Sequence, residues 1–221
     1  MEAEAQFIHY QLKEAMPSLM KEGQQNDGRA LYALGQIFLT QGIYTGDTRT
    51  LLRSMAAFSK GKEDSEEKVL CRSACCTMEV GGLSRTGKTE DDVAMADALS
   101  RMAEGGDVLA MTEWAACLLY GTGTEKDAEE SLSWLRRAAS QDYWLARLRL
   151  LQTERLKEDR ESRRDVFNQA NHLVLMGVPD GEFYLGECYE AGWGTEPAWN
   201  KAVHHYDRAY SLGNPAAAMR L

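Results

Sequence analysis

Two stretches of the 221-residue sequence superpose without a gap, and they decide the fold: Ala110-Met-Thr-Glu-Trp-Ala-Ala-Cys-Leu-Leu-Tyr-Gly-Thr-Gly123 and Gly181-Glu-Phe-Tyr-Leu-Gly-Glu-Cys-Tyr-Glu-Ala-Gly-Trp-Gly194. The offset from Ala110 to Gly181 is 71 residues, and it also aligns Cys117 with Cys188. A weaker copy lies between the two stretches. The chain therefore contains an internal repeat, which changes the meaning of every local motif.

Each repeat unit predicts two helices. The small residues that open the first helix are spaced by 35 to 40 residues: Ala30, Leu70, Ala110, Ala146, Gly181 and Ala217. The predicted closing turns recur at a similar spacing of 35 to 45 residues: Gly61, Gly106, Asp142, Gly177 and Gly213. Apolar residues recur at every third and fourth position, which is helical rather than strand periodicity. One hairpin cannot bury both of its faces, so the repeats must stack. We expect an all-α, right-handed α-solenoid of stacked antiparallel helix pairs.

The repeat also sets the expected domain organisation. Residues 2–22 form an amphipathic pattern that predicts an N-terminal capping helix, within a cap of residues 1–27. Pro17 would kink or split this helix. Residues 28–221 are expected to form the solenoid, with about five units and a truncated sixth helix from Pro215 onward.

These residues resemble the Sel-one-like repeat family, relatives of the tetratricopeptide repeat. The family pattern is Ala, Leu-Gly, Tyr, Gly-x-Gly, an acidic residue, Ala, an aromatic residue and Ala-Ala before a closing Gly. The unit that starts at Gly181 matches it most fully, the unit from Ala110 matches it well, and the unit from Ala30 matches it in part. The resemblance spans about residues 28–221 and implies a scaffold that holds other proteins or peptides, without a chemistry of its own.

Composition narrows the choice of partners. The chain has 34 acidic against 25 basic residues, a net charge of −9 and a mean hydropathy of −0.45. A protein that binds the nucleic-acid backbone needs a basic stripe, so we expect no nucleic-acid partner. The acidic amino terminus does not resemble a secretory signal, and no apolar run approaches the length of a membrane span. We expect a cytoplasmic protein without a membrane partner.

One segment favours a rival function. Residues 82–89 satisfy the P-loop pattern G-x-x-x-x-G-K-[ST], in which Gly82 and Gly87 shape the loop, Lys88 reaches the outer phosphates and Thr89 holds Mg²⁺. The pattern requires a buried strand before the loop, whereas residues 70–80 have helical periodicity. The alternative function is thus a nucleotide-dependent switch, and the favoured interpretation of the segment is an interhelical loop.

Other chemistry has weaker support. Five cysteines, an odd number, fit a reducing compartment better than a disulfide framework. Cys71 and Cys75 share a helix face, but such a pair is weak support for a zinc site. No spacing suggests a catalytic triad or dyad. We therefore expect no enzymatic activity, no metal, no cofactor and no obligatory small-molecule ligand.

The predicted binding surface comes from the resemblance. In the related tetratricopeptide hairpin, concave positions lie two before, two after and five after the Leu of the Leu-Gly pair, with a deeper row further back. Transferred to this chain, they include these residues: Arg29, Tyr32, Gln36, Leu39, Arg72, Glu79, Leu109, Thr112, Leu148, Gln152, Arg155, Phe183, Glu187 and Glu190.

Within this set, Tyr32 and Phe183 would be aromatic anchors, while arginine and glutamine side chains would act as polar hooks. Such a groove fits a peptide or helix that carries apolar and acidic residues. The alternative is that these side chains are ordinary surface or intersubunit contacts. The leading hypothesis is a protein–protein interaction scaffold or adaptor that binds its partner through the concave face.

Overall fold

The structure is a computed structural model that describes residues 2–64, 68–80 and 89–221, and for residues 62–64 and 77–80 it describes the backbone alone. In these ranges every regular element is helical, which confirms the all-α prediction. The elements are α1 (Glu2–Ile8), α2 (Leu12–Gln24), α3 (Gly28–Thr45), α4 (Thr48–Asp64), α5 (Lys68–Val80), α6 (Glu90–Glu104), α7 (Val108–Tyr120), α8 (Ala128–Ala139), α9 (Trp144–Glu154), α10 (Arg160–Leu175), α11 (Pro179–Ala191), α12 (Trp199–Ser211) and the 3₁₀ helix η1 (Ala217–Met219).

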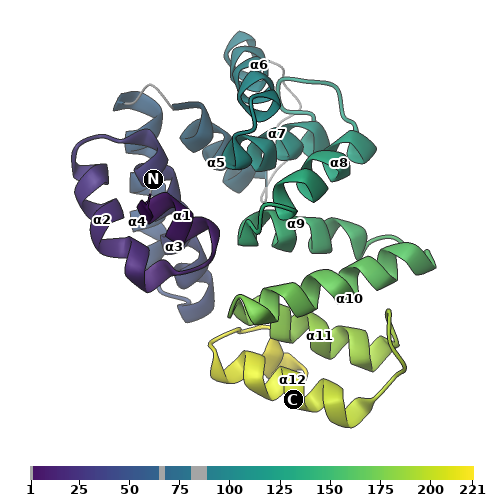
Figure 1. Cartoon of the computed structure of the whole chain (residues 1–221). Helices are drawn as coiled ribbons and strands as arrows, with labels where there is room; N and C mark the ends of the chain where they lie inside the picture. The colour runs from purple at the N-terminus through teal and green to yellow at the C-terminus, as the bar shows by residue number, and fades with distance from the viewer. Residues whose placement is uncertain (1, 65–67, 81–88) are drawn as a thin grey trace. The chain divides into compact units, whose positions relative to one another are not determined.

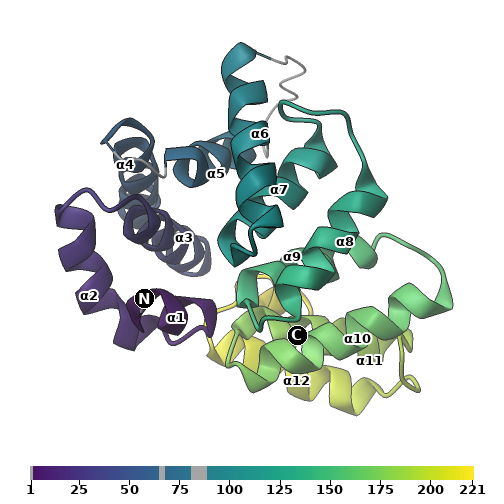
Figure 2. The ribbon, with the colours of Figure 1, turned by 45° about the horizontal axis from the view of Figure 1, so that its top comes forward.

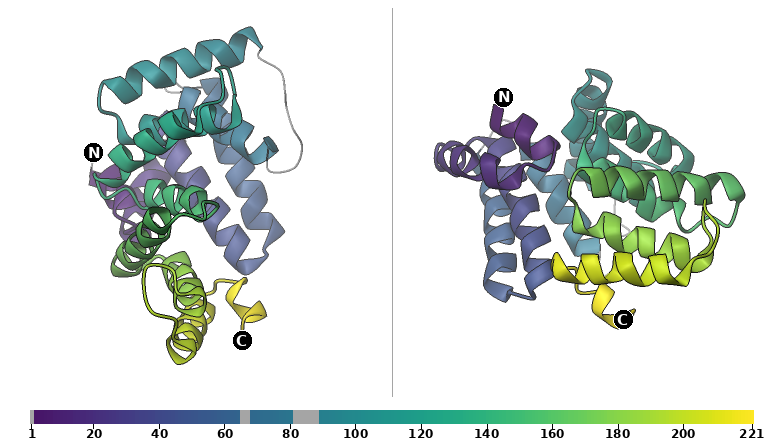
Figure 3. Two further views of the ribbon diagram at one scale, coloured as in Figure 1. Left: turned by 90° about the vertical axis from the view of Figure 1, so that its right-hand side faces the viewer. Right: turned by 60° about the horizontal axis from the view of Figure 1, so that its bottom comes forward.

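The chain divides into two compact units, residues 1–141 and 142–221. In unit 1, α3 packs on α4, α6 packs on α7 and α7 packs on α8 (Figures 2 and 3). In unit 2, α10 packs against both α9 and α11, and α12 lies beside α11 (Figure 1). Consecutive helices therefore pack as the pairs of an α-solenoid.

The helix boundaries have local causes that recur along the chain. Asp27 and Asp107 cap α3 and α7 by accepting a hydrogen bond from the backbone N–H three residues later, at 2.8 and 2.9 Å. Before each of several helical repeats, the backbone turns through a residue in the left-handed region. These residues are Asn26, Gly106, Asp142, Gly177 and Gly213. Glycine and Asx residues adopt this conformation at low cost, which explains their recurrence at these turns.

The predicted turn at Gly61 is wrong. Gly61 is buried inside α4, where a Cβ would lie 2.3 Å from the Cys71 sulfur. Glycine is needed here because α4 and α5 pack closely, so its role is contact between helices rather than a helix stop.

The two ends also differ from the prediction. The single N-terminal helix is two helices, α1 and α2, and the break lies at Tyr10, whose φ is 62°. Pro17 lies inside α2 and does not split it. After Pro215, the structure forms the three-residue η1 in place of a longer helix.

Inside the hairpins, a small residue on the first helix faces a large one on the second. A Cβ on Gly186 would lie 2.4 Å from the ring of Tyr206, and Gly35 has the same relation to Phe58. In the repeat that starts at Ala110, Ala115 occupies the register position of Gly186. Its counterpart on the second helix is Leu135 instead of an aromatic residue. The repeat thus conserves the packed volume rather than the residue identity.

Among the described helices, none is both long and apolar enough to cross a membrane.

Candidate functional site

The structure brings five of the predicted contact residues together in unit 2, along α9 and α11. Arg155 follows the last turn of α9 and donates from Nη2 to both carboxylate oxygens of Glu187, at 3.0 and 3.1 Å. Its guanidinium also lies over the ring of Tyr184, 5.4 Å from the centroid. Gln152 donates from its side-chain amide to the Tyr184 hydroxyl at 3.3 Å. We call the surface formed by Gln152, Arg155, Phe183, Tyr184, Glu187 and Glu190 the α9–α11 face.

The buried side of this face is well packed. Phe183 is half-buried, and its ring lies 5.4 Å from the Tyr184 ring and 5.8 Å from the Tyr206 ring. Tyr184 is 8% exposed, and burial raises the pKa of its hydroxyl. The face therefore offers oriented aromatic and polar groups at fixed positions, with Gln152 and Glu190 exposed at its surface.

In unit 1 the predicted anchor Tyr32 lies in the core instead. It is 0% exposed, and its hydroxyl donates to Oε1 of Glu113 on α7 at 2.7 Å. Ser73 on α5 donates to the other carboxylate oxygen at 2.7 Å. The buried Glu113 carboxylate thus links the first helices of three repeats, and Tyr32 has no exposed surface for a partner.

Three further predicted residues of unit 1 are also buried: Gln36, Leu109 and Thr112. In unit 2, Leu148 is 9% exposed. Leu39 is half-buried on α3, and Glu79 lies in α5 with its side chain outside the described residues. Gln36, Leu109, Thr112 and Leu148 therefore belong to the packed interior and not to an open groove.

The two predicted arginine contacts of unit 1, Arg29 in the deeper row and the polar hook Arg72, have intramolecular partners. Arg29 donates from Nε to Glu4 on α1 at 2.7 Å, and Nη1 contacts Asp107, the cap of α7. Burial lowers the pKa of Arg29, but its bonds to Glu4 and Asp107 outweigh this effect and raise it. Arg72 contacts Asp91 and Asp92 at the start of α6. Both guanidinium groups connect helices, so neither supports the expected acidic partner.

The P-loop alternative finds no support. Gly82, Gly87 and Lys88 lie outside the described residues, but the element before them is the helix α5, not a strand. Thr89 is the N-cap of α6: its side-chain oxygen accepts from the Asp92 N–H, and the Asp92 carboxylate accepts from the Thr89 N–H. The Thr89 hydroxyl is engaged in a capping box rather than placed beside a loop that binds phosphate.

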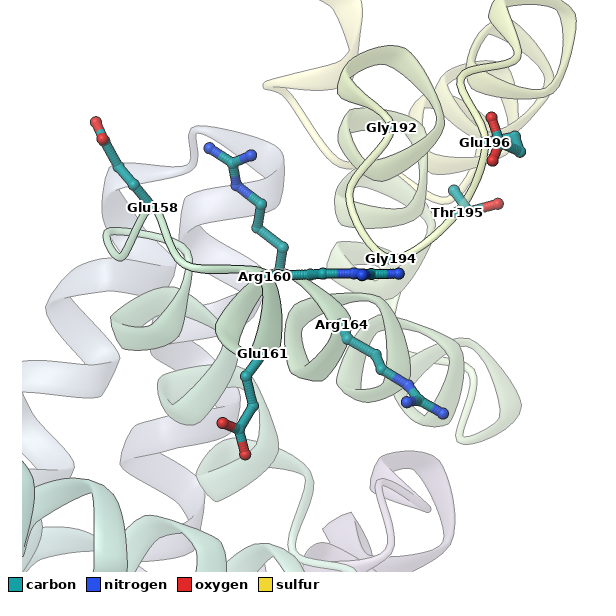
Figure 4. Close-up of a pocket in the computed structure, with 9 residues that line it drawn as sticks. Glu158, Arg160, Glu161, Arg164, Gly192, Gly194, Thr195 and Glu196 are labelled. Atoms are coloured by element: carbon teal, nitrogen blue, oxygen red, sulfur yellow. The ribbon is translucent and has the colours of Figure 1, made fainter.

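A second surface of unit 2 is an open hollow of about 1060 Å³ between the start of α10 and the α11–α12 loop (Figure 4). Its lining contains side chains of both charges and a few uncharged residues: Glu158, Arg160, Glu161, Arg163, Arg164, Gly192, Gly194, Thr195 and Glu196. Figure 4 shows the side chains of Glu158, Glu161 and Arg164 pointing in different directions. Opposite charges that do not converge define no ligand, so we assign no site to this hollow.

The cysteines occupy packing positions. Cys117 and Cys188, which share a register position that lies among apolar residues in both repeats, are 2% and 0% exposed. Burial raises the pKa of the Cys188 thiol to about 12. Among the described residues, no three His, Cys, Asp or Glu side chains gather as a metal site requires.

The sequence interpretation missed Tyr184, Glu113 and Arg220. Tyr184 and Glu113 occupy one register position, immediately before the Leu of the Leu-Gly pair or its equivalent. In the repeat that starts at Leu70, Ser73 occupies the same position. A polar residue recurring there among apolar neighbours was the available signal, because it can reach the adjacent first helix. Arg220 had no repeat signal, since it lies beyond the last full hairpin.

Comparisons with known proteins agree with this geometry. The structure defines a helical-repeat protein, and the Sel1 repeat model matches residues 108–143 and 179–214. The two matched segments are the two stretches that superpose in the sequence, together with the second helix of each repeat. No curated protein sequence matches it.

Two solved structures are similar. A protective antigen of uropathogenic Escherichia coli strains, which displays an SLR fold, aligns with a TM-score of 0.54 at 21% identity, over 94% of this chain and 43% of its own. A Sel1 repeat protein from Oxalobacter formigenes aligns with a TM-score of 0.47 at 29% identity, over 56% of this chain and 94% of its own. The first supports the fold.

Proposed function

We propose that this chain is a protein-interaction scaffold and that it binds another protein or peptide through the α9–α11 face of unit 2. The Sel1-repeat family supports the general role of holding other proteins. The observation that carries the finer proposal is the exposure pattern of the predicted contact residues. In unit 1, Tyr32, Gln36, Leu109 and Thr112 are buried. In unit 2, Gln152 and Glu190 are exposed and Phe183 is half-exposed, and Arg155, although paired with Glu187, keeps a third of its side chain exposed.

The composition of the face fits this role. Protein interfaces concentrate aromatic and arginine side chains, and these groups dominate their binding energy. Here an arginine and two aromatic rings are held in place by contacts within the chain, so little side-chain entropy is lost when a partner binds. The proposal assigns no catalytic chemistry to the chain.

Site-specific photocrosslinking in the native cell tests the proposal. A photoreactive residue at Gln152, which is exposed on the α9–α11 face, is expected to capture a discrete partner protein. The matched control is Asn168, which is exposed on α10 in the same unit. Capture at position 152 but not at 168 supports the proposal. Equal capture at both positions, or none at 152, contradicts it.

A further inference from the structure

Two acidic residues of the α9–α11 face hold an arginine from elsewhere in the same unit. Glu187 and Glu190 are three residues apart on α11, so their carboxylates lie on one side of the helix. Arg220, which follows η1, reaches both of them. Its Nη2 lies 3.1 Å from Oε1 of Glu187, and its Nη1 lies 3.5 Å from Oε2 of Glu190.

Side chains other than Arg220 also contact both carboxylates and hold them in position. Glu187 is 7% exposed and is held by Arg155. Glu190 accepts a hydrogen bond of 2.5 Å from the Tyr206 hydroxyl. Burial raises the pKa of Tyr206, and the bond to Glu190 raises it further, so the hydroxyl stays protonated and donates. The acidic pair is thus positioned by groups other than Arg220.

Arg220 is the least constrained member of this cluster. Its side chain is 43% exposed, and the neighbouring Met219 and Leu221 are 89% and 58% exposed. Only Ala217 buries its side chain in this segment after Pro215. When Arg220 moves away, Glu187 keeps its ion pair with Arg155, and Glu190 keeps the hydrogen bond from Tyr206 but loses the cation that Arg220 supplied. Two carboxylates on one side of a helix favour a replacement cation that can contact both of them.

We propose that the Glu187–Glu190 pair is the point at which a partner protein inserts an arginine side chain, and that Arg220 occupies this point until the partner binds. This inference rests on the proposed scaffold function and names the chemistry of its partner. Arginine fits better than lysine because its planar fork can contact two carboxylates at once. The net charge of −9 also favours the approach of a basic segment. The expected acidic partner is thereby replaced by a basic one.

The test uses the chain of residues 1–221 and a fluorescein-labelled peptide with the sequence of residues 215–221, Pro-Ala-Ala-Ala-Met-Arg-Leu. Fluorescence anisotropy is expected to show at least about ten-fold tighter binding to the Arg220→Ala chain than to the wild type, because a tethered competitor acts at an effective concentration near millimolar. A second peptide with alanine in place of its arginine is expected to bind the Arg220→Ala chain at least about ten-fold more weakly.

A matched pair of variants locates the site. Adding Glu190→Gln to Arg220→Ala is expected to abolish the preference for the arginine peptide, while glutamine can still accept the Tyr206 hydrogen bond. Adding Glu196→Gln instead removes an exposed carboxylate of the same unit and is expected to preserve the preference. Thermal melts establish that both chains are folded. As a second measurement, raising the salt concentration is expected to weaken binding of the arginine peptide to Arg220→Ala.

Equal binding of the two peptides, or an arginine preference that survives Glu190→Gln, overturns the inference. If this occurs while the Gln152 crosslink persists, the scaffold proposal stands and only the arginine chemistry fails. If both experiments fail, the α9–α11 face is not the binding surface.

Discussion

At the scale of single residues, the polar groups between first helices determine how neighbouring repeats align. Glu113 is 0% exposed, and the hydroxyl groups of Tyr32 and Ser73 both donate to it. A carboxylate buried without donors is costly, so each hydroxyl has a measurable effect on stability. The same register position carries Tyr184 in unit 2, which is also buried and forms the inner side of the α9–α11 face.

Tyr32→Phe removes one hydrogen bond to the buried Glu113 carboxylate and leaves the ring in place. We expect the free energy of unfolding to fall by about 1.5–3 kcal/mol, the range for a hydrogen bond to a charged group. Urea denaturation measures the change. Tyr120→Phe, at a tyrosine that is 41% exposed, is the control and is expected to stay within about 0.5 kcal/mol of the wild type. Equal effects at the two sites would contradict the buried assignment.

The Cys188 thiol is expected to resist alkylation in the native protein. Burial raises its pKa to about 12, so at pH 8 the nucleophilic thiolate is scarce, and the sulfur is also shielded from solvent. Mass spectrometry after iodoacetamide treatment is expected to show reaction at least about 100-fold slower in the folded chain than in urea. Cys75, which is half-exposed on α5, is expected to react faster. Similar rates for Cys188 in both states would show that it is not buried.

At the scale of elements, the loop between the two helices of a repeat docks on the preceding second helix. In unit 1 a Cβ on Gly123 would lie 2.0 Å from the Asp92 carbonyl oxygen at the start of α6. In unit 2, Gly194 has the same relation to the Arg163 carbonyl of α10, at 3.1 Å, and the offset of 71 residues relates both pairs. The second glycine of Gly-x-Gly thus serves close backbone packing as well as the turn.

Gly123→Ala and Gly177→Ala separate these two roles. Both residues have positive φ, 70° and 79°, but a Cβ on Gly177 meets nothing within 4 Å. We expect Gly177→Ala to cost about 1–2 kcal/mol from backbone strain alone. Gly123→Ala is expected to cost more, because α6 must also move away from the loop. Thermal and urea unfolding measure both. If the two losses were equal, the loop would not pack on α6 as described.

At the scale of the whole molecule, the repeats provide many surfaces between helices but few converging polar groups. Within the described residues the ionic contacts mainly connect helices, as Arg29 does for α1, α3 and α7. On the α9–α11 face such a cluster also reaches the surface, as does the contact of Arg72 with Asp91 in unit 1. This distribution fits a chain that binds macromolecules along a face better than one that encloses a small ligand.

Mg-ATP and Mg-GTP are therefore expected to leave the melting temperature of the full chain unchanged. A ligand present at 100 times its dissociation constant would stabilise the folded state by about 2.7 kcal/mol, a shift that differential scanning fluorimetry detects. Thr89 is engaged as the α6 cap, and α5 takes the place of the required strand. A stabilisation that disappears in Lys88→Ala would revive the nucleotide-dependent switch.

The sequence by itself determined the repeat, the helical class and the burial of Cys117 and Cys188, because these depend on local periodicity and on small residues at fixed spacing. It also placed four of the five left-handed turns that precede the repeats, at Gly106, Asp142, Gly177 and Gly213, since few residue types accept positive φ. The tertiary structure alone decided that Gly61 packs on Cys71 instead of ending a helix, and that Tyr32 faces Glu113 instead of a groove. It likewise brought Arg220 to Glu187 and Glu190. These outcomes depend on which helix lies next to which face, and the register of a single hairpin does not contain that information.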